Sequence, residues 1–375
     1  MGLLRLYLAF CVISTHTGSI IPWPIQGGEE AVEIFFMISG FYMSLVALKY
    51  TSTRQFYVSR LLRIFSSYWI TLGFIIAISI GFGIFSGNNW LVLNPYVYSP
   101  LDKNGFMGIF LTAFTNLTLF FQDWIMFLTQ DYGKNLAFTS NFRGSTQPLY
   151  QYLLIPQAWT VSIELVFYLL FPFLNKLKNK TLVIILIASV LVRIFTYEVL
   201  KLNTDPWNYR FFPFEIAFFV LGMLSFRVYS VSPIGKTSSP AGNAMLYVLL
   251  IPVLLFLFVK AKLASTIIAQ HAGLEYMEYA RLSFYLVWAF AIPLLFHIFK
   301  RSEIDRFIGE LSYPTYLIHL TVLALIRSIL SMYGLSPDQS GIFIAVVSIC
   351  WAIGFYVIII KRLDVARSKI VSRQI

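Results

Sequence analysis

Long blocks of apolar residues alternate with short polar segments along most of the chain. Ten of these blocks predict helices, and most approach the ~20 residues that an α-helix needs to cross the hydrocarbon core of a bilayer. They cover residues 3–21, 31–49, 64–85, 158–174, 182–200, 211–229, 244–259, 282–299, 311–332 and 341–360. The pattern predicts an all-α, polytopic bundle of about ten transmembrane helices, in a single integral-membrane domain over residues 1–375.

The segment 87–157 is predicted to be a long loop on the outer side of the membrane. Residues 106–128 within it are apolar enough to form an eleventh span, which would move every later loop to the opposite side. Asn116, Gln122 and Asp123 interrupt this apolar run. We therefore expect a re-entrant or interfacial helix at 106–128 rather than a full crossing.

The composition excludes several other classes of protein. Hydrophobic residues make up 58% of the 375 residues and charged residues only 12%, whereas roughly a quarter of a soluble domain is charged. The mean hydropathy is +0.75. A soluble enzyme, a disordered chain and a secreted disulfide scaffold are excluded, because a soluble chain of this size needs more polar surface than this one can supply.

The charge distribution predicts the orientation in the membrane. The net charge is +11, from 28 Lys and Arg against 17 Asp and Glu, and the predicted loops on one side carry most of the basic residues. Cytoplasmic loops show this excess. The residues on that side are Arg5, Lys49, Arg54, Arg60, Arg63, Lys176, Lys178, Lys180, Arg227, Lys236, Lys300, Arg301, Arg306, Lys361, Arg362, Arg367, Lys369 and Arg373. We expect both termini in the cytoplasm, and membrane lipid rather than nucleic acid as the partner of the basic surface.

The cysteines and histidines do not indicate a metal centre. Cys11 and Cys350 each lie in an apolar stretch, and the chain has four histidines. We expect neither a disulfide nor a metal cofactor. The first apolar block carries Arg5 and His16 and has no small-x-small cleavage site, so we expect it to be retained rather than removed as a signal peptide.

Several ionisable residues fall inside the predicted spans. A charge at the bilayer centre costs at least ~3 kcal/mol on insertion scales, so each one is a candidate for function or for pairing. They are Arg5, His16, Glu33, Glu164, Arg193, Glu215, His319 and Arg327. Arg193, Glu215 and Arg327 suit structural ion pairs, but the sequence does not indicate which residues they contact.

Arg5 and His16 are predicted to lie on one face of the first helix. Their separation of eleven residues corresponds to about three turns plus 20°, and to about 16 Å along the axis. This places a phosphate-binding cation at the cytoplasmic end and a proton carrier deeper in the membrane. The alternative is an interfacial arginine together with a histidine that bonds a neighbouring backbone carbonyl.

Two acidic residues and two further arginines extend this pattern. Glu33 lies at the outer end of the second helix, near the level of His16, where a carboxylate would orient the imidazole; a helix N-terminal acid is the alternative. Glu164 lies nearly two turns into a strongly apolar helix and should face the interior. Arg60 and Arg63 stand at the cytoplasmic end of the third helix, either as a polyanion site with Arg5 or as ordinary cytoplasmic-side residues.

The ninth predicted helix carries one polar stripe. Ser312, Tyr316 and His319 follow each other at i, i+4 and i+7, so their side chains share a face. They are candidates for contacts to substrate or to a developing oxyanion. Hydrogen bonds that hold helices together are the alternative role for these three residues.

Taken together, these blocks resemble the membrane acyltransferase family 3 proteins, which O-acylate carbohydrates and lipids. The matching features are Arg5-x10-His16, Phe35-Phe36-x-x-Ser39-Gly40-Phe41 with Glu33 just before it, Arg60-x-x-Arg63 followed by Tyr68-Trp69, Trp159-Thr160-x-x-x-Glu164-x-x-Phe167-Tyr168, and Gly309-x-Leu311-Ser312-Tyr313-x-x-Tyr316-Leu317-x-His319. They occur in the family's order and span nearly the whole chain. Glu33 stands where the family often has Asp, the Pro often found between Arg63 and Tyr68 is missing, and Pro314 interrupts the last block.

The resemblance implies a multi-pass enzyme of the bacterial inner membrane. It would move an acyl group, most often acetyl, from cytoplasmic acyl-CoA to a hydroxyl of a cell-surface carbohydrate or lipid-linked glycan. Arg5, Arg60 and Arg63 would hold the anionic head of coenzyme A, and His16 would act as general base, with Glu33 or Glu164 orienting its imidazole. A secondary transporter or flippase, and a subunit that relays acyl groups to a separate transferase, are the alternative functions.

Overall fold

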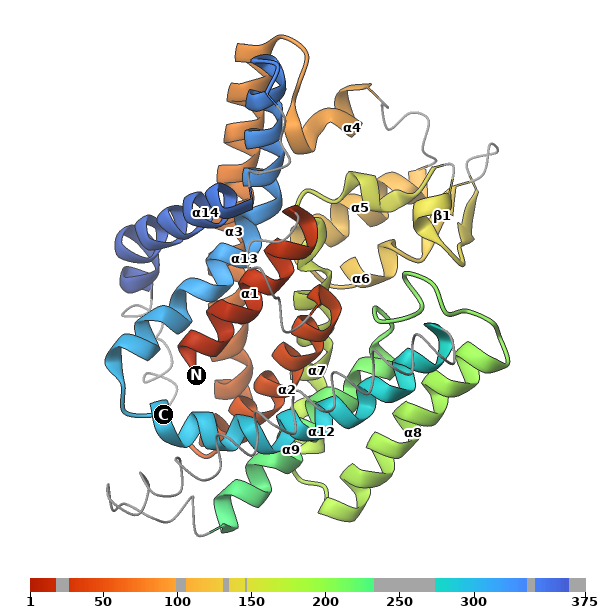
Figure 1. Cartoon of the computed structure of the whole chain (residues 1–375), viewed down its shortest axis with the longest axis vertical. Helices are drawn as coiled ribbons and strands as arrows, with labels where there is room; N and C mark the ends of the chain where they lie inside the picture. Colours follow the sequence, from red (N-terminus) through yellow and green to blue (C-terminus); the bar gives the residue numbers. More distant parts are fainter. Residues whose placement is uncertain are drawn as a thin grey trace.

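The computed structural model describes residues 1–17, 27–98, 106–130, 135–145, 147–232, 274–335 and 341–363, with backbone only for 274–283. Almost all regular structure in these ranges is helical (Figure 1). The helices are α1 (Gly2–Thr17), α2 (Gly28–Ala47), α3 (Thr53–Ser86), α4 (Asn94–Tyr98), α5 (Phe106–Thr118), α6 (Gln122–Ile125), α7 (Trp159–Leu174), α8 (Asn179–Glu198), α9 (Phe212–Val231), α12 (Leu274–Phe299), α13 (Glu303–Met332) and α14 (Gly341–Phe355). Two short antiparallel strands, β1 (Leu128–Gln130) and β2 (Leu136–Phe138), form the only sheet in the described ranges.

Seven helices in the described part of the chain are long and apolar enough to cross a membrane. They are α2, α3, α8, α9 and α13, together with Pro156–Leu174, which contains α7, and Gly341–Leu363, which contains α14. The apolar helices α1 and α5 are shorter, as is the described part of α12, Phe284–Phe299. The fold is thus the predicted all-α membrane bundle, whereas the count of ten spans and the orientation of the termini stay predictions. The span predicted at 244–259 lies outside the described residues.

Three helices, α3, α12 and α13, begin well before the apolar blocks that predicted them, and serine residues cap two of them. The third was predicted to start at residue 64 but begins at Thr53, where the Ser52 side chain accepts a hydrogen bond from the Gln55 amide. The ninth was predicted to start at residue 311 but begins at Glu303, where Ser302 caps the helix in the same way. Hydropathy does not detect such polar first turns, because the helix continues past the apolar stretch while its capping residues satisfy the free amides.

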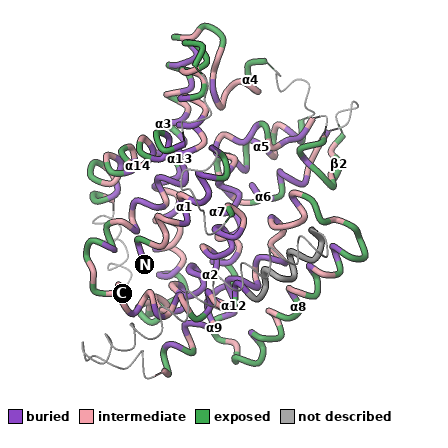
Figure 2. The backbone as a smooth tube through the Cα atoms, in the orientation of Figure 1, coloured by how far each residue is buried: buried purple, intermediate pink, exposed green. Residues whose placement is uncertain are grey.

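The centre of the bundle is formed by α1, α2, α7, α9 and α13, and α8 and α14 lie at its edge (Figure 2). Helices α2 and α9 pack unusually closely through two glycines. A Cβ atom added at Gly40 would lie 2.0 Å from the Phe219 carbonyl oxygen, and one added at Gly222 would lie 1.9 Å from the Met37 carbonyl oxygen. Gly40 and Gly222 therefore set the close packing of α2 and α9, since only glycine permits this approach of two backbones.

Helix α1 is fixed at its start to the first turn of α13. The Asp305 carboxylate accepts hydrogen bonds from the backbone amides of Gly2 and Leu3, at 2.7 and 2.9 Å. It therefore satisfies two of the amides that have no partner within α1. This contact places Arg5 against Gly309 of α13, and so brings the first and the last predicted motifs together.

The segment between α3 and α7 contains the hairpin and the short helices α4 to α6. Helix α5 has thirteen residues and is therefore about 20 Å long, which is less than the thickness of a hydrocarbon core. Its polar face, with Thr112, Thr115 and Asn116, is buried, whereas its aromatic face, with Phe106 and Phe110, is exposed. The re-entrant or interfacial helix expected at residues 106–128 stays a prediction.

Candidate active site

A cavity of about 680 Å³ opens at the end of the bundle where α1, α3 and α13 begin and α2 and α12 end. We call this the basic end, because Arg5, Lys49, Arg60, Arg63, Lys300 and Arg306 line the cavity there. The acidic lining residues are Glu164, Asp305 and Glu310, so the described lining has an excess of three positive charges. One cavity is thus lined by the three arginines that the sequence analysis selected from separate motifs, Arg5, Arg60 and Arg63.

The cations of this cavity differ in how far their donors are already used. Arg63 donates to both oxygens of Glu310, at 2.8 and 2.9 Å, and Arg60 donates to the Tyr50 hydroxyl at 2.6 Å. The side chains of Arg5, Lys49 and Arg306 make no hydrogen bond or ion pair with any described residue. These three side chains therefore retain their full capacity to bind an anion.

Lys49, Lys300 and Arg306 were not predicted as site residues, although the sequence placed them on the same side as Arg5. Each lies at the end or the start of a helix, where a basic residue is expected on the cytoplasmic side of any membrane protein. The signal in the sequence that could have identified them is their position next to the motifs that resemble the family. Arg306, for example, precedes Gly309 by three residues. Only the packing of the helices shows that they line the same cavity.

Glu164 lines the cavity as an acceptor shared by two hydroxyls. Ser39 of α2 donates to its Oε1 atom at 2.5 Å, and Tyr168, one turn further along α7, donates to the same oxygen at 2.6 Å. Glu164 therefore faces the interior, as its position in an apolar helix predicted. Ser39 was quoted only as part of a motif, and its contact with Glu164 links two blocks that lie 125 residues apart.

Ser312 and Tyr316 line the cavity, but their hydroxyl protons are directed to backbone carbonyls. Ser312 donates to the Gly309 carbonyl at 2.7 Å, within its own helix. Tyr316 donates to the Gln157 carbonyl at 2.8 Å and accepts a hydrogen bond from Thr160 at 3.0 Å. Either hydroxyl could donate to an oxyanion only after its hydrogen bond to the backbone carbonyl is broken.

His319 and His16 lie beyond Tyr316 and are not part of the cavity lining. The ring centroid of His319 is 5.6 Å from that of Tyr316 and 5.6 Å from that of His16. His319 is fully buried, whereas His16 is exposed, and Arg327 donates to the His16 backbone carbonyl at 3.2 Å. The sequence led us to expect one passage from Arg5 to His16, but the cavity ends at Tyr316, whose ring is held by Gln157 and Thr160.

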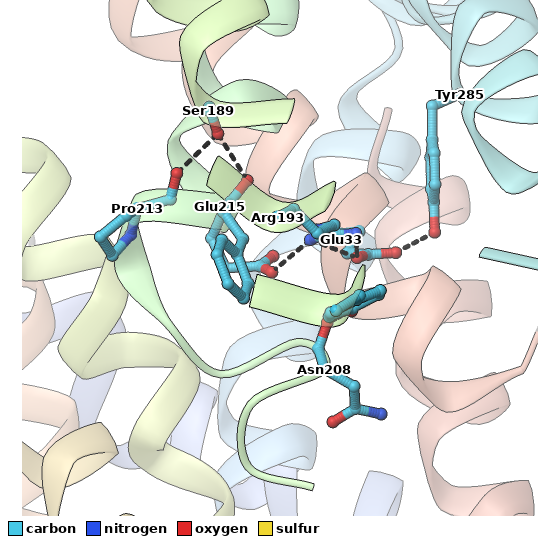
Figure 3. A network of polar contacts seen from close by, with 9 residues as sticks. Glu33, Ser189, Arg193, Asn208, Pro213, Glu215 and Tyr285 are labelled. Atoms are coloured by element: carbon cyan, nitrogen blue, oxygen red, sulfur yellow. Dashed lines mark hydrogen bonds and ion pairs between the residues drawn. The ribbon is translucent and has the colours of Figure 1, made fainter. Parts of the chain in front are cut away.

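Glu33 does not contact His16 as the sequence suggested. Its carboxylate instead accepts hydrogen bonds from Arg193 of α8 and from the Tyr285 hydroxyl of α12 (Figure 3). Arg193 also donates to Glu215 of α9 at 2.9 Å, so one guanidinium joins both acids. We call these four residues the buried ion cluster. The side chain turns away because α9 packs on α2 and α8 packs on α9, which brings Arg193 and Glu215 to Glu33. No local pattern in the sequence indicates this packing.

The buried ion cluster also identifies the partners of Arg193 and Glu215, which the sequence left open. Their exposed fractions are 7% and 0%, and Glu33 is exposed to only 2%. The Arg193 guanidinium lies over the rings of Phe214 and Phe218, at 5.5 and 5.3 Å. Because charges so deeply buried require partners, the contacts account for all three residues as elements that hold α2, α8, α9 and α12 together.

Comparison with known proteins gave one match. No curated protein and no solved structure matched the chain. Residues 1–361, nearly the whole chain, match the family model described as an acyltransferase domain. The protein is therefore a multi-pass membrane acyltransferase that belongs to membrane acyltransferase family 3.

Proposed function

We propose that this protein transfers an acyl group, acetyl as the expected case, from cytoplasmic acyl-CoA to a hydroxyl of a cell-surface carbohydrate or lipid-linked glycan. The observation that supports this most strongly is the cavity itself. It gathers arginines from α1 and α3 at one end and Glu164, Ser312 and Tyr316 at the other. A cationic entrance with hydroxyl and carboxylate groups further inside suits a thioester whose other end is a phosphorylated nucleotide.

The chemistry of coenzyme A matches the charges at the basic end. Its head carries several phosphate charges, and guanidinium groups bind phosphate with two parallel hydrogen bonds. Arg5, Lys49 and Arg306 have their donors unused within the described part of the chain, so they can bind the head without losing an internal contact. The thin pantetheine arm would then extend along α1 toward Glu164 and Tyr316.

The transfer needs a base for the acceptor hydroxyl, and His16 is our proposal for it. The hydroxyl oxygen attacks the thioester carbonyl, His16 takes the hydroxyl proton, and the carbon–sulfur bond breaks as the ester forms. The proton then returns to the departing thiolate, so free CoA thiol and the ester are the products. Because His16 lies beyond Tyr316, the acyl end must pass the Tyr316 ring before it meets the acceptor.

The test is turnover of labelled acetyl-CoA by the purified protein in lipid nanodiscs, with a surface glycan extract as acceptor. We expect release of CoA thiol and incorporation of label into the glycan. The Arg60→Ala variant should raise KM for acetyl-CoA about tenfold or more, the loss expected for a charged hydrogen bond. Arg54→Ala is the matched control, since Arg54 is exposed on the same helix and does not line the cavity.

Other outcomes of the same assay would contradict the proposal. Movement of a labelled glycan lipid across the nanodisc or vesicle membrane without thioester turnover would favour a transporter. Turnover that requires a second purified protein would favour a subunit that relays acyl groups. An unchanged KM in the Arg60→Ala variant would remove the basic end as the site of the donor.

A further inference from the structure

The imidazole of His319 is held in one tautomer. Its Nδ1 atom lies 2.6 Å from the backbone carbonyl oxygen of Tyr316. Because a carbonyl oxygen can only accept, Nδ1 carries the proton and donates it. The Nε2 atom of the neutral ring is then an acceptor with a free lone pair.

This Nε2 atom is buried and has no hydrogen-bond partner among the residues that the structure describes. Buried polar atoms without a partner are rare in folded proteins, because each costs free energy that a bond would recover. His319 has an exposed fraction of 0%, and the ring of His16 lies next to it, with the two ring centroids 5.6 Å apart. An unpartnered Nε2 atom next to a second imidazole can receive a proton, whereas it contributes no bond that holds helices together.

His319 lies between the end of the cavity and His16. On one side lies Tyr316, whose ring the thioester must pass from the cavity, so the thiolate leaves on the same side of Tyr316 as His319. On the other side lies His16, which would take the proton of the acceptor hydroxyl. We infer that His319 is a second catalytic imidazole, which receives the proton from His16 on Nε2 and delivers it to the thiolate of the departing coenzyme A.

The proton balance of this route is complete, and it rests on the proposed function. The acceptor O–H bond breaks and His16 becomes an imidazolium; its proton passes to Nε2 of His319, and from there to the thiolate sulfur, which becomes the thiol. Both imidazoles end neutral. The Tyr316 carbonyl stabilises the transient His319 cation, since it accepts the Nδ1 proton throughout.

Two substitutions separate this role from a structural one. In His319→Asn, the side-chain amide replaces the Nδ1 donor and can still bond the Tyr316 carbonyl, but no atom replaces Nε2. In His319→Gln, the amide reaches the position of Nε2 but cannot take a proton. We expect both variants to lower kcat for acyl transfer about 10²–10⁴-fold, the range of general acid–base catalysis, with KM for acetyl-CoA unchanged. A purely structural His319 would leave His319→Asn close to wild type.

A matched control and a rescue experiment complete the test. His297→Asn changes another buried histidine, whose Nδ1 lies 3.0 Å from the Tyr229 hydroxyl, and should leave kcat unchanged. In His319→Ala, added imidazole should restore part of the turnover, whereas absence of rescue together with an active His319→Asn would overturn the inference. If His319→Asn does not fold, the rescue alone decides. Failure of the proposed function is distinguishable, because the wild-type protein would then show no acetyl-CoA turnover.

Discussion

Two groups of charged residues lie around α2, and they differ in how their arginines are satisfied. In the buried ion cluster, Arg193 is surrounded by two carboxylates and two aromatic rings. At the basic end, Arg5 lines an open cavity, and its side chain makes no hydrogen bond or ion pair with any described residue. An arginine thus holds helices together where other residues bond its donors, as at Arg193, and is suited to ligand binding where its donors are unused, as at Arg5.

Helix α2 contributes to both groups from different faces. Glu33 and Ser39 are six residues apart, which corresponds to about 240° around the helix axis. Glu33 joins the buried ion cluster, whereas Ser39 donates to Glu164 in the cavity. Substitutions in the two groups should therefore have separable effects, the first on stability and the second on turnover.

The largest expected effect is loss of folding when the cluster loses its cation. Arg193→Ala leaves Glu33 and Glu215 buried without their shared guanidinium, and breaking a buried pair in this way costs about 3–5 kcal/mol. We expect a much lower thermal midpoint in detergent and poor recovery as a monodisperse protein. Arg54→Ala, on an exposed position, should behave as wild type. A wild-type midpoint for Arg193→Ala would show that the cluster does not hold the helices together.

His16→Ala should have an effect of similar size, but on catalysis alone. We expect acyl transfer to fall about 10²–10⁴-fold, because the base for the hydroxyl is lost. The thermal midpoint should not change, since His16 is exposed and its one described hydrogen bond uses the backbone carbonyl. Both quantities are measured on the same purified sample. Acylation at the wild-type rate would refute His16 as the base.

Arg5→Ala should act on donor binding with little effect on either folding or kcat. We expect KM for acetyl-CoA to rise about 10–100-fold, the loss of one hydrogen bond to a charged group, and Arg5→Lys to recover part of it by keeping the charge. Steady-state kinetics over a range of acetyl-CoA concentrations would measure this. If Arg5→Ala lowered kcat instead, the residue would act nearer the chemistry than the basic end implies.

The smallest expected effect concerns Glu310, which competes with a donor phosphate for Arg63. Glu310→Gln removes that charge, and half-exposed pairs of this kind contribute about 0.2–1 kcal/mol. We therefore expect KM for acetyl-CoA to fall by a factor of about two to five. High salt should reduce the difference between the variant and wild type, because it screens exposed charges. A rise in KM would mean that Glu310 positions Arg63 rather than competing for it.

The sequence indicated the membrane bundle and the side on which most cavity-lining cations lie, because hydropathy and the placement of basic residues are local signals. It also placed Glu164 in the interior, since its helix is apolar on all sides. It did not indicate where Glu33 would turn, because that depends on Arg193, which lies 160 residues further along the chain. Arg193 reaches Glu33 only because α8 packs on α9 and α9 packs on α2. It did not indicate the separation of His16 from the cavity either, because that depends on two hydrogen bonds that hold one tyrosine ring.

The close packing of α2 and α9 at Gly40 and Gly222 limits how these two helices can move. With no room for even a methyl group between the backbones, α2 and α9 cannot approach each other further, and a larger residue at either position would force them apart. The two helices therefore stand at the smallest separation that their backbones allow, so a change in the shape of the bundle at this seam can only increase it.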